Sequence, residues 1–311
     1  MLCSCGRPHA TLLAERQDAD QIAIEDLSAQ ARELPPGPRR DLILAKVKEL
    51  KAEVRAERQM ALALKLAKRE MVSNLRSALE LTSAEQLLSL PREQLLDFIV
   101  RSGLGLAVDD FMQAEQRIID SALDTLQVIV AGADIRDMPE IGLVGISAAE
   151  AVFDDVILPD SLASVRASLQ SISVGVPVAQ ALTPLAQRLE QSTGRQLTVA
   201  RTQLASVGRS AQASAAAELE LNLYLYTGPR DGVTRDFCQP LINKVVDEKQ
   251  MRRLNNGQGL PVKTYGGGYN CRHSWSPITE SFFEAANLTK ATAQDITRAN
   301  AGGATHSNTI A

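Results

Sequence analysis

The chain has 311 residues, of which 45% are hydrophobic but only 4% are aromatic. Leu, Ala, Val and Ile therefore supply most of the apolar content, a balance that is typical of helix-rich proteins and argues against an all-β fold. The 33 basic and 37 acidic residues give a formal net charge of -4, so the total charge neither indicates nor excludes a nucleic-acid partner.

Targeting signals are not evident in the sequence. The N-terminus lacks a basic start followed by an apolar run and a cleavage site, and no uninterrupted apolar run of about 18 residues occurs. We therefore expect neither a secretory signal nor a membrane-spanning helix, and we expect the chain to stay where it is made. Its four cysteines are too few for a disulfide scaffold, and a cytoplasmic assembly site would keep them reduced unless a metal or burial intervenes.

The first two segments differ in their pattern. Residues 1–38 are polar and end in a proline-rich stretch that opposes helix continuation, so we expect an N-terminal arm. Residues 39–81 contain no Pro or Gly, and their apolar residues recur at intervals of three, four or seven, which predicts one long amphipathic helix. The other face of this helix mixes Lys and Arg with Glu. That mixture indicates a solvated surface with ion pairs, or alternatively a contact with DNA or with a neighbouring subunit.

Shorter helices are expected next. Ser83-Ala84-Glu85-Gln86 has the form of a capping box, which begins a helix, and Gly103 can supply the left-handed conformation that ends the following segment. Residues 109–130 have the pattern of a further helix. Glycines and prolines interrupt the pattern between residues 131 and 192, so we assign no firm structure there. Together, residues 39–192 are predicted as a helical region.

The last third of the chain changes in composition. Residues 196–221 are rich in Ala and predict another long helix. All four Tyr, the only Trp and two of the four Cys then lie between residues 222 and 275. The same segment has eight basic residues and only four acidic ones. This change predicts a separate, locally basic domain. The fold class that we expect is mainly α, with long N-terminal helices and a small α+β C-terminal domain.

Four short motifs follow one another in this part of the chain. They are Ala200-Arg201-Thr202-Gln203, then Tyr226…Gly228-Pro229…Asp231-Gly232…Thr234-Arg235…Cys238, then Asn256-Gly257, and finally Gly268-Tyr269-Asn270-Cys271-Arg272-His273. In this order the motifs resemble the C-terminal domain of the phage Mu F-like minor head (head morphogenesis) proteins of tailed bacteriophages. The resemblance covers roughly residues 197–277. It implies a domain at 193–277, followed by a C-terminal tail at 278–311. The chain departs from the family at Gln203, where Glu is common, and at Cys238, where His is frequent.

The resemblance implies a function in the virion. A protein of this family is a structural, low-copy head component near the portal or inside the capsid, assembled in the host cytoplasm, with a role in head assembly and genome packaging or delivery. Its expected partners are the portal and major capsid proteins and, without sequence specificity, the packaged DNA; we expect it to be oligomeric in the virion. Two alternatives remain open: an internal ejection protein that is released with the DNA, and a metal-dependent or thiol enzyme.

Three residues could form a metal site. Thiolate and imidazole are preferred zinc ligands, and a small loop-rich domain gains folding energy from a metal, so Cys238, Cys271 and His273 are candidate ligands of a structural zinc. The same residues have three other interpretations. They could form a Cys238–Cys271 disulfide, be two buried thiols, or provide a Cys-His nucleophile pair.

A fourth zinc ligand is not evident from the sequence. Asp236 is close to Cys238 in the chain, and Cys3, Cys5 or His9 would serve only if the N-terminal arm returned to the domain. The spacing of Cys3, Cys5 and His9 also resembles half of a metal knuckle.

Charged residues in the same motifs have two interpretations. Arg201, Arg235 and Arg272 either pair with acidic residues such as Asp231 to fix loops, or contact phosphate groups of DNA. The sequence has no feature of a base-reading helix or zinc finger, so any DNA binding should be independent of sequence and strongly dependent on salt.

Overall fold

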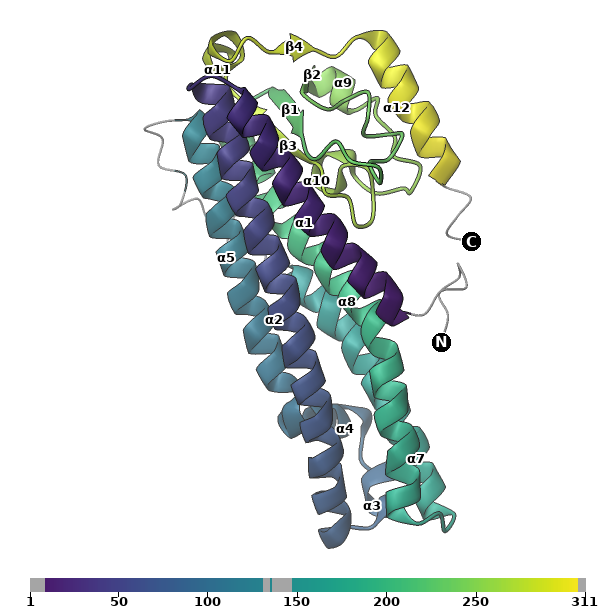
Figure 1. Cartoon of the computed structure of the whole chain (residues 1–311). Coiled ribbons are helices and arrows are strands. Elements are labelled where there is room, and N and C mark those ends of the chain that lie inside the picture. The colour runs from purple at the N-terminus through teal and green to yellow at the C-terminus, as the bar shows by residue number, and fades with distance from the viewer. Residues whose placement is uncertain (1–8, 131–134, 136–146, 307–311) are drawn as a thin grey trace. The chain divides into compact units, whose positions relative to one another are not determined.

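The computed structural model describes residues 9–130, 135 and 147–306, with backbone alone at 9–17 and 306. Of the described residues 73% are helical, and the protein has long N-terminal helices and a small four-stranded mixed sheet toward the C-terminus (Figure 1). This architecture confirms the fold class that the composition and periodicity predicted.

Helices make up the N-terminal two thirds of the chain. They are α1 (His9–Glu33), α2 (Pro38–Leu81), α3 (Ala84–Leu88), α4 (Arg92–Ile99), the π-helical turn η1 (Val100–Leu104), α5 (Gly105–Ile129), a second π-helical turn η2 (Phe153–Ile157), α7 (Leu158–Ser173) and α8 (Val178–Glu218). Within the described residues, no helix combines the length and the apolar character that crossing a membrane would require.

The sheet and its short helices follow. They are β1 (Leu223–Thr227), β2 (Lys244–Asp247), α9 (Glu248–Met251), α10 (Val262–Tyr265), β3 (Ser274–Ile278), α11 (Glu280–Ala285), β4 (Thr289–Lys290) and α12 (Ala293–His306). We call this part of the chain, residues 223–306, the sheet module.

The chain divides into two compact units, and three helices contribute residues to both. One unit is built from Ala56–Ala114 and Ile146–Gln203, and the other from Leu2–Arg55, Glu115–Gly145 and Leu204–Ala311. The divisions fall inside α2, α5 and α8. The domain boundary expected near residue 193 therefore lies within α8, in a continuous helix.

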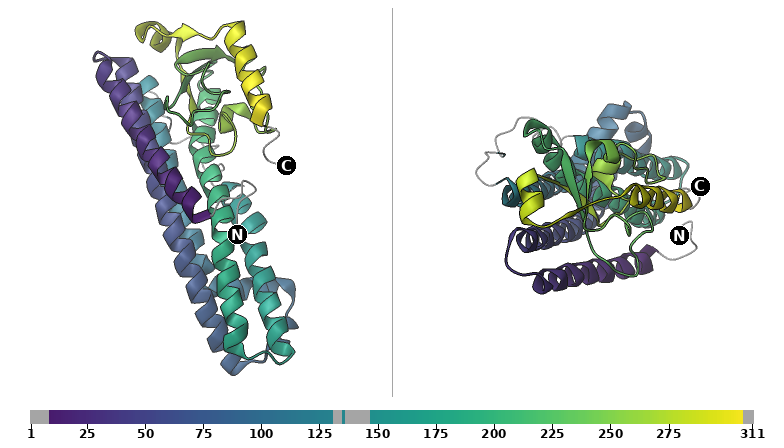
Figure 2. Two further views of the ribbon diagram at one scale, coloured as in Figure 1. Left: turned by 45° about the vertical axis from the view of Figure 1, so that its right-hand side comes forward. Right: turned by 90° about the horizontal axis from the view of Figure 1, so that it is seen from above.

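Helix α1 occupies most of the segment that was expected to be an arm. Figure 2 shows it beside the first half of α2. The residues of this contact are Ala23, Ile24, Leu27, Ala31, Ile43, Val47 and Leu50. Because the buried stripe of α1 is narrow and half of it is Ala, its apolar periodicity is weak in the sequence.

Two local predictions are confirmed in the unit that contains the C-terminal part of α2 and the N-terminal part of α8. Ser83 and Gln86 form the capping box that begins α3. Gly103 has a φ of 145°, and a Cβ there would lie 2.6 Å from the carbonyl oxygen of Ala67, so this position accepts only Gly beside α2. In the segment that carried no firm assignment, residues 147–173 are helical, and α8 follows from Val178 with Pro184 inside it.

The sheet has the strand order β3-β1-β2-β4. Strand β1 pairs antiparallel with β2 and β3, and β2 pairs parallel with β4. The core of the module includes Tyr224, Tyr226 and Trp275, together with Ala291 and Ile296. The expected boundary after Pro277 thus falls inside β3. Residues 280–306 were expected to belong to a tail, but they supply the edge strand β4 and side chains of the core, among them Ala291 and Ile296.

Candidate metal centre

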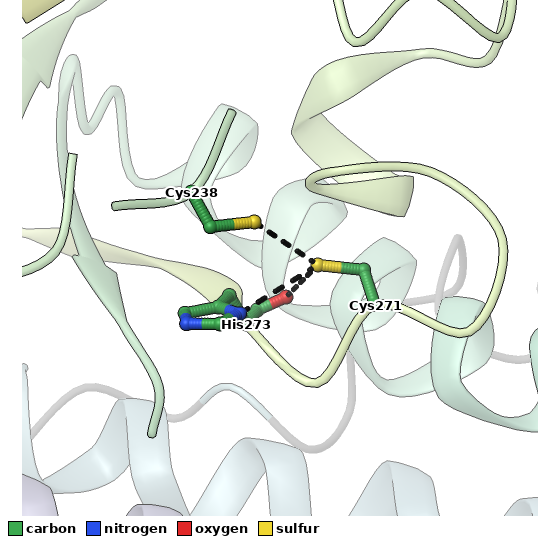
Figure 3. Close-up of side chains that lie close together, drawn as sticks. All are labelled: Cys238, Cys271 and His273. Atoms are coloured by element: carbon green, nitrogen blue, oxygen red, sulfur yellow. Dashed lines mark hydrogen bonds between the residues drawn. The ribbon is translucent and has the colours of Figure 1, made fainter. Parts of the chain in front are cut away.

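Cys238, Cys271 and His273, here called the Cys2His triad, meet in the interior of the sheet module. Their ligand atoms all lie within 4.8 Å of one another, and Figure 3 shows the three side chains pointing toward a common centre. The two Sγ atoms are 3.8 Å apart, and Cys271 Sγ lies 3.9 Å from His273 Nδ1. The exposed fractions are 1%, 7% and 3% in chain order, so the triad is shielded from solvent.

Strand pairing explains why distant residues meet. In the register of β1 and β3, Thr227 at the end of one strand is paired with Ser274 at the start of the other. His273 therefore lies beside Gly228, where a Cβ would be only 2.3 Å from the imidazole Cδ2. Cys238 belongs to the turns that follow β1, and its amide donates to the carbonyl of Arg235.

The imidazole has a defined orientation. His273 Nε2 lies 2.9 Å from the carbonyl oxygen of Pro229, and a carbonyl can only accept, so Nε2 is the donor. In the neutral ring the lone pair is then on Nδ1, the atom that faces Cys271. A backbone contact that fixes the second ring nitrogen in this way is the usual support of a metal-binding histidine.

A glycine loop encloses the sulfur atoms. The amide of Gly267 donates to Cys271 Sγ at 3.1 Å, a contact that stabilises a thiolate. A Cβ at Gly267 would lie 2.6 Å from Cys238 Sγ, and Gly266 has a φ of 54°. The run Gly266-Gly267-Gly268 is thus explained by the close approach of the backbone to both sulfurs.

The two thiols have opposite pKa shifts. The hydrogen bond with Cys238 holds the pKa of Cys271 well below its ordinary value despite burial, and His273 and Arg209 act in the same direction. That same hydrogen bond, together with burial, raises the pKa of Cys238 well above the ordinary value. The carbonyl oxygen of Cys271 accepts a hydrogen bond from Arg209 at 2.6 Å.

Tyr226 is a neighbour of the triad that sequence reasoning missed. Its ring stacks on the imidazole of His273 with a centroid distance of 5.5 Å. Its hydroxyl lies 3.3 Å from Cys238 Sγ and 3.7 Å from Cys271 Sγ. Burial raises the pKa of the phenol well above its ordinary value, and the two cysteines add to the effect.

Arginines fix the loops around the triad. Arg235 donates to the carbonyl oxygens of Gly267 and Tyr269. Arg272 donates to both carboxylate oxygens of Asp231, at 2.6 and 2.9 Å, and the side chains of this pair are 10% and 8% exposed. These contacts stabilise the two segments that carry the cysteines.

Other candidate residues lie elsewhere. Arg201 belongs to the other unit, where it pairs with Glu57 at 3.0 Å. Within the described residues, Asp236 is not among the side chains close enough to share a metal with the triad. Cys3 and Cys5 lie outside the described residues, as does the side chain of His9.

The geometry favours metal binding over nucleophilic chemistry. Both cysteines are free thiols, and their 3.8 Å separation is well beyond the roughly 2.05 Å of a disulfide bond. A catalytic thiol has to meet its substrate, whereas these sulfurs are enclosed by the glycine loop and by Tyr226. Three soft and borderline ligand atoms around one point are instead the usual donor set of zinc.

Comparisons with known protein families, with curated proteins and with solved structures find no match to this chain.

Proposed function

We propose that this chain is a structural minor head protein of a tailed phage virion, located near the portal or inside the capsid, and that its sheet module is held together by zinc at the Cys2His triad. In this proposal the protein acts in head assembly and in packaging or delivery of the genome. Its partners are the portal and major capsid proteins, and it is oligomeric in the virion. It is not an enzyme.

The observation that carries this proposal is that residues of different motifs contact one another. Gly228 makes room for His273, and Asp231 pairs with Arg272. Asn256 donates to the carbonyl oxygens of Leu260 and Gly266. Three of the four motifs that resemble the Mu F-like domain, those that follow α8, thus serve to build one small interior site. Such a pattern supports a structural module.

The distance between the two sulfur atoms of the triad supports zinc. A tetrahedral zinc with Zn–S bonds of about 2.3 Å places two thiolates about 3.8 Å apart, and the observed separation of the Sγ atoms is 3.8 Å. Burial of a charged site is tolerated when the metal neutralises its ligands. In a module of short strands and turns, binding of the metal would add directly to folding stability.

Metal analysis of the purified full chain tests the zinc proposal. We expect one zinc per chain by elemental mass spectrometry, and loss of that zinc in Cys238→Ser and in His273→Ala. The double variant Cys3→Ser/Cys5→Ser is the matched control, and it should keep the metal because those thiols lie outside the triad. A metal-free wild type after reconstitution with zinc under reducing conditions would overturn the proposal.

Virion composition tests the proposed function. The experiment is quantitative mass spectrometry of purified virions before and after triggered DNA ejection, with the major capsid protein as reference. We expect low copy number and retention in empty heads. Departure of the chain with the DNA would replace the proposal by the ejection-protein alternative, and absence from virions would refute both.

Contact with packaged DNA is part of the same proposal. Binding through Lys and Arg to phosphates releases counterions, so affinity should be independent of sequence and should fall steeply as salt rises. Equilibrium binding of the full chain to two unrelated duplexes at several salt concentrations measures both properties. An affinity that does not change with salt would exclude this mode of contact.

A further inference from the structure

The Cys2His triad supplies three ligand atoms, whereas structural zinc sites are almost always four-coordinate. We propose that the hydroxyl oxygen of Tyr226 is the fourth ligand. This inference rests on the proposed zinc site and goes beyond it, because it identifies a residue that the ordinary zinc-ligand types, Cys, His, Asp and Glu, do not include.

The position of the hydroxyl oxygen fits the open corner of a tetrahedron. For Zn–S bonds of about 2.3 Å and a Zn–O bond of about 2.0 Å, the oxygen lies about 3.5 Å from each sulfur. The observed distances from Tyr226 are 3.3 Å to Cys238 Sγ and 3.7 Å to Cys271 Sγ. Both values are close to that edge length, so a metal between the three atoms requires little movement.

The fold holds this oxygen in place. Tyr226 is 0% exposed and belongs to the central strand β1, which is paired on both sides. Its ring packs against the rings of His273, at a centroid distance of 5.5 Å, and Trp275, at 4.2 Å. Ligands on rigid elements with packed rings are preorganised, because little side-chain freedom is lost when the metal binds.

The glycine loop leaves room at the same point. A Cβ at Gly266 would lie 3.2 Å from the Tyr226 hydroxyl and 3.3 Å from Cys271 Sγ. Loop, tyrosine and cysteine thus converge on one small volume. Cys238, Cys271 and Tyr226 would hold the metal as two thiolates and a phenolate, with the neutral imidazole of His273 as the remaining ligand, and their three protons would pass to solvent.

Cobalt substitution provides the test. Cobalt(II) replaces zinc in thiolate sites, and the intensity and position of its visible bands report the coordination number and the ligand set. We would compare full-length wild type with Tyr226→Phe, which removes one oxygen and keeps the ring. Tyr224→Phe is the matched control. It lies on the same strand and in the same core, but its hydroxyl contacts the carbonyl oxygen of Leu221 at 3.1 Å.

We expect Tyr226→Phe to change the visible bands and to weaken zinc binding by about tenfold or more in competition with a chelator, since even outer-shell changes cost about 10- to 100-fold. The control should match wild type in both respects. Wild-type bands and wild-type affinity in Tyr226→Phe would refute the tyrosine ligand and leave the zinc site intact. A wild type that binds neither metal would refute the zinc site itself.

A second measurement needs no substitution at Tyr226 and so remains valid if that variant does not fold. The chain has four tyrosines, and labelling their Cζ carbons with ¹³C gives one NMR signal for each hydroxyl-bearing carbon. Zinc should shift one signal strongly, and Tyr224→Phe should not remove it. If no tyrosine Cζ signal moves when zinc is bound, the tyrosine ligand is refuted.

Discussion

Glu115 on α5 is a carboxyl group that is only 3% exposed, and its Oε1 has no hydrogen-bond partner among the described residues. Burial raises the pKa of Glu115 to about 8, from an ordinary value of 4.5. The folded protein therefore binds this proton more tightly than the unfolded chain does. The stability that the buried, protonated Glu115 contributes is fully present below about pH 4.5 and is lost as the pH rises toward about 8.

The substitution Glu115→Gln should remove this pH dependence, because an amide does not ionise in the range. At pH 8 the variant should be more stable than wild type, by at most about 5 kcal/mol in the free energy of unfolding. Urea denaturation at pH 5 and pH 8 measures the effect. Asp109→Asn, exposed on the same helix, is the control. Equal pH slopes for wild type and Glu115→Gln would show that Glu115 is ionised in the folded state.

The ion pair of Arg272 with Asp231 depends on the shape of the guanidinium group. Burial tends to raise the pKa of Asp231, but the hydrogen bonds and charge of Arg272, with Thr234 and the amide of Val233, hold it below its ordinary value. A carboxylate with a depressed pKa contributes stability above its unfolded pKa of about 3.8, and this contribution is lost as the pH falls through the folded pKa.

The substitution Arg272→Lys keeps the charge but loses the bidentate hydrogen bonding to Asp231. We therefore expect it to reduce the free energy of unfolding by about 1–3 kcal/mol at pH 7. The loss should shrink at a pH low enough to protonate Asp231 in both proteins. Chemical denaturation at both pH values measures it. Arg252→Lys, in an exposed pair with Glu248, should change little. Similar effects of the two substitutions would mean that Arg272 does not fix the loop.

At the scale of elements, the glycine loop should be the most sensitive part of the sheet module. In Gly267→Ala, the new Cβ would lie 2.6 Å from Cys238 Sγ, and the short cysteine side chain has little freedom to move away. We expect the free energy of unfolding to fall by about 1–3 kcal/mol and zinc binding to weaken. Thermal melts and chelator competition would measure the two effects.

Gly232→Ala is the matched control for that experiment, because a Cβ at Gly232 has no neighbour within 4 Å among the described residues. It should leave both stability and zinc binding almost unchanged. If Gly267→Ala bound zinc as tightly as this control, the loop would have to be looser around the sulfurs than the structure indicates.

The helices could be predicted where the apolar pattern was long and uninterrupted, as in α2 and α5. Helix α1 was missed because its buried stripe relies on Ala23 and Ala31, which give little periodic signal. The first part of α8 was missed because Pro184 normally opposes a helix. There, the buried side chains of Leu182 and Leu185 compensate for the hydrogen bond that the proline removes.

The site could be predicted in part. Residue types alone identified Cys238, Cys271 and His273 as one candidate group, because thiolate and imidazole are both preferred zinc ligands. Tyr226 could not be found in this way. It lies 12 residues from Cys238 and 45 from Cys271, and only the register of β1 with β3 brings its hydroxyl to the sulfurs. The ion pair of Arg201 with Glu57 likewise depends on helix packing that the sequence does not reveal.

For the whole molecule, zinc should act as a stabilising ligand. A ligand that binds only the folded state adds about 2.7 kcal/mol at a free concentration one hundred times its dissociation constant. The unfolding midpoint of wild type should therefore rise as free zinc is raised, and it should fall when a chelator is added. Calorimetry at several buffered zinc concentrations measures the shift. Cys238→Ser should show no dependence on zinc; a rise equal to that of wild type would place the binding site elsewhere.

The sharing of α2, α5 and α8 between the two compact units has a practical consequence for dissecting the protein. A fragment that begins at residue 193 would start in the middle of α8 and would lack the segments of α1, α2 and α5 that belong to the same unit as the sheet module. Such a fragment would lose the contacts of α8 with α5, where a Cβ at Gly208 would lie 3.0 Å from Ile118 and Gln212 donates to the carbonyl oxygen of Ala122 at 2.8 Å. We therefore expect the region that resembles a separate domain in the sequence to fold poorly when it is cut from α8 in this way, and the full-length protein is the better material for studying it.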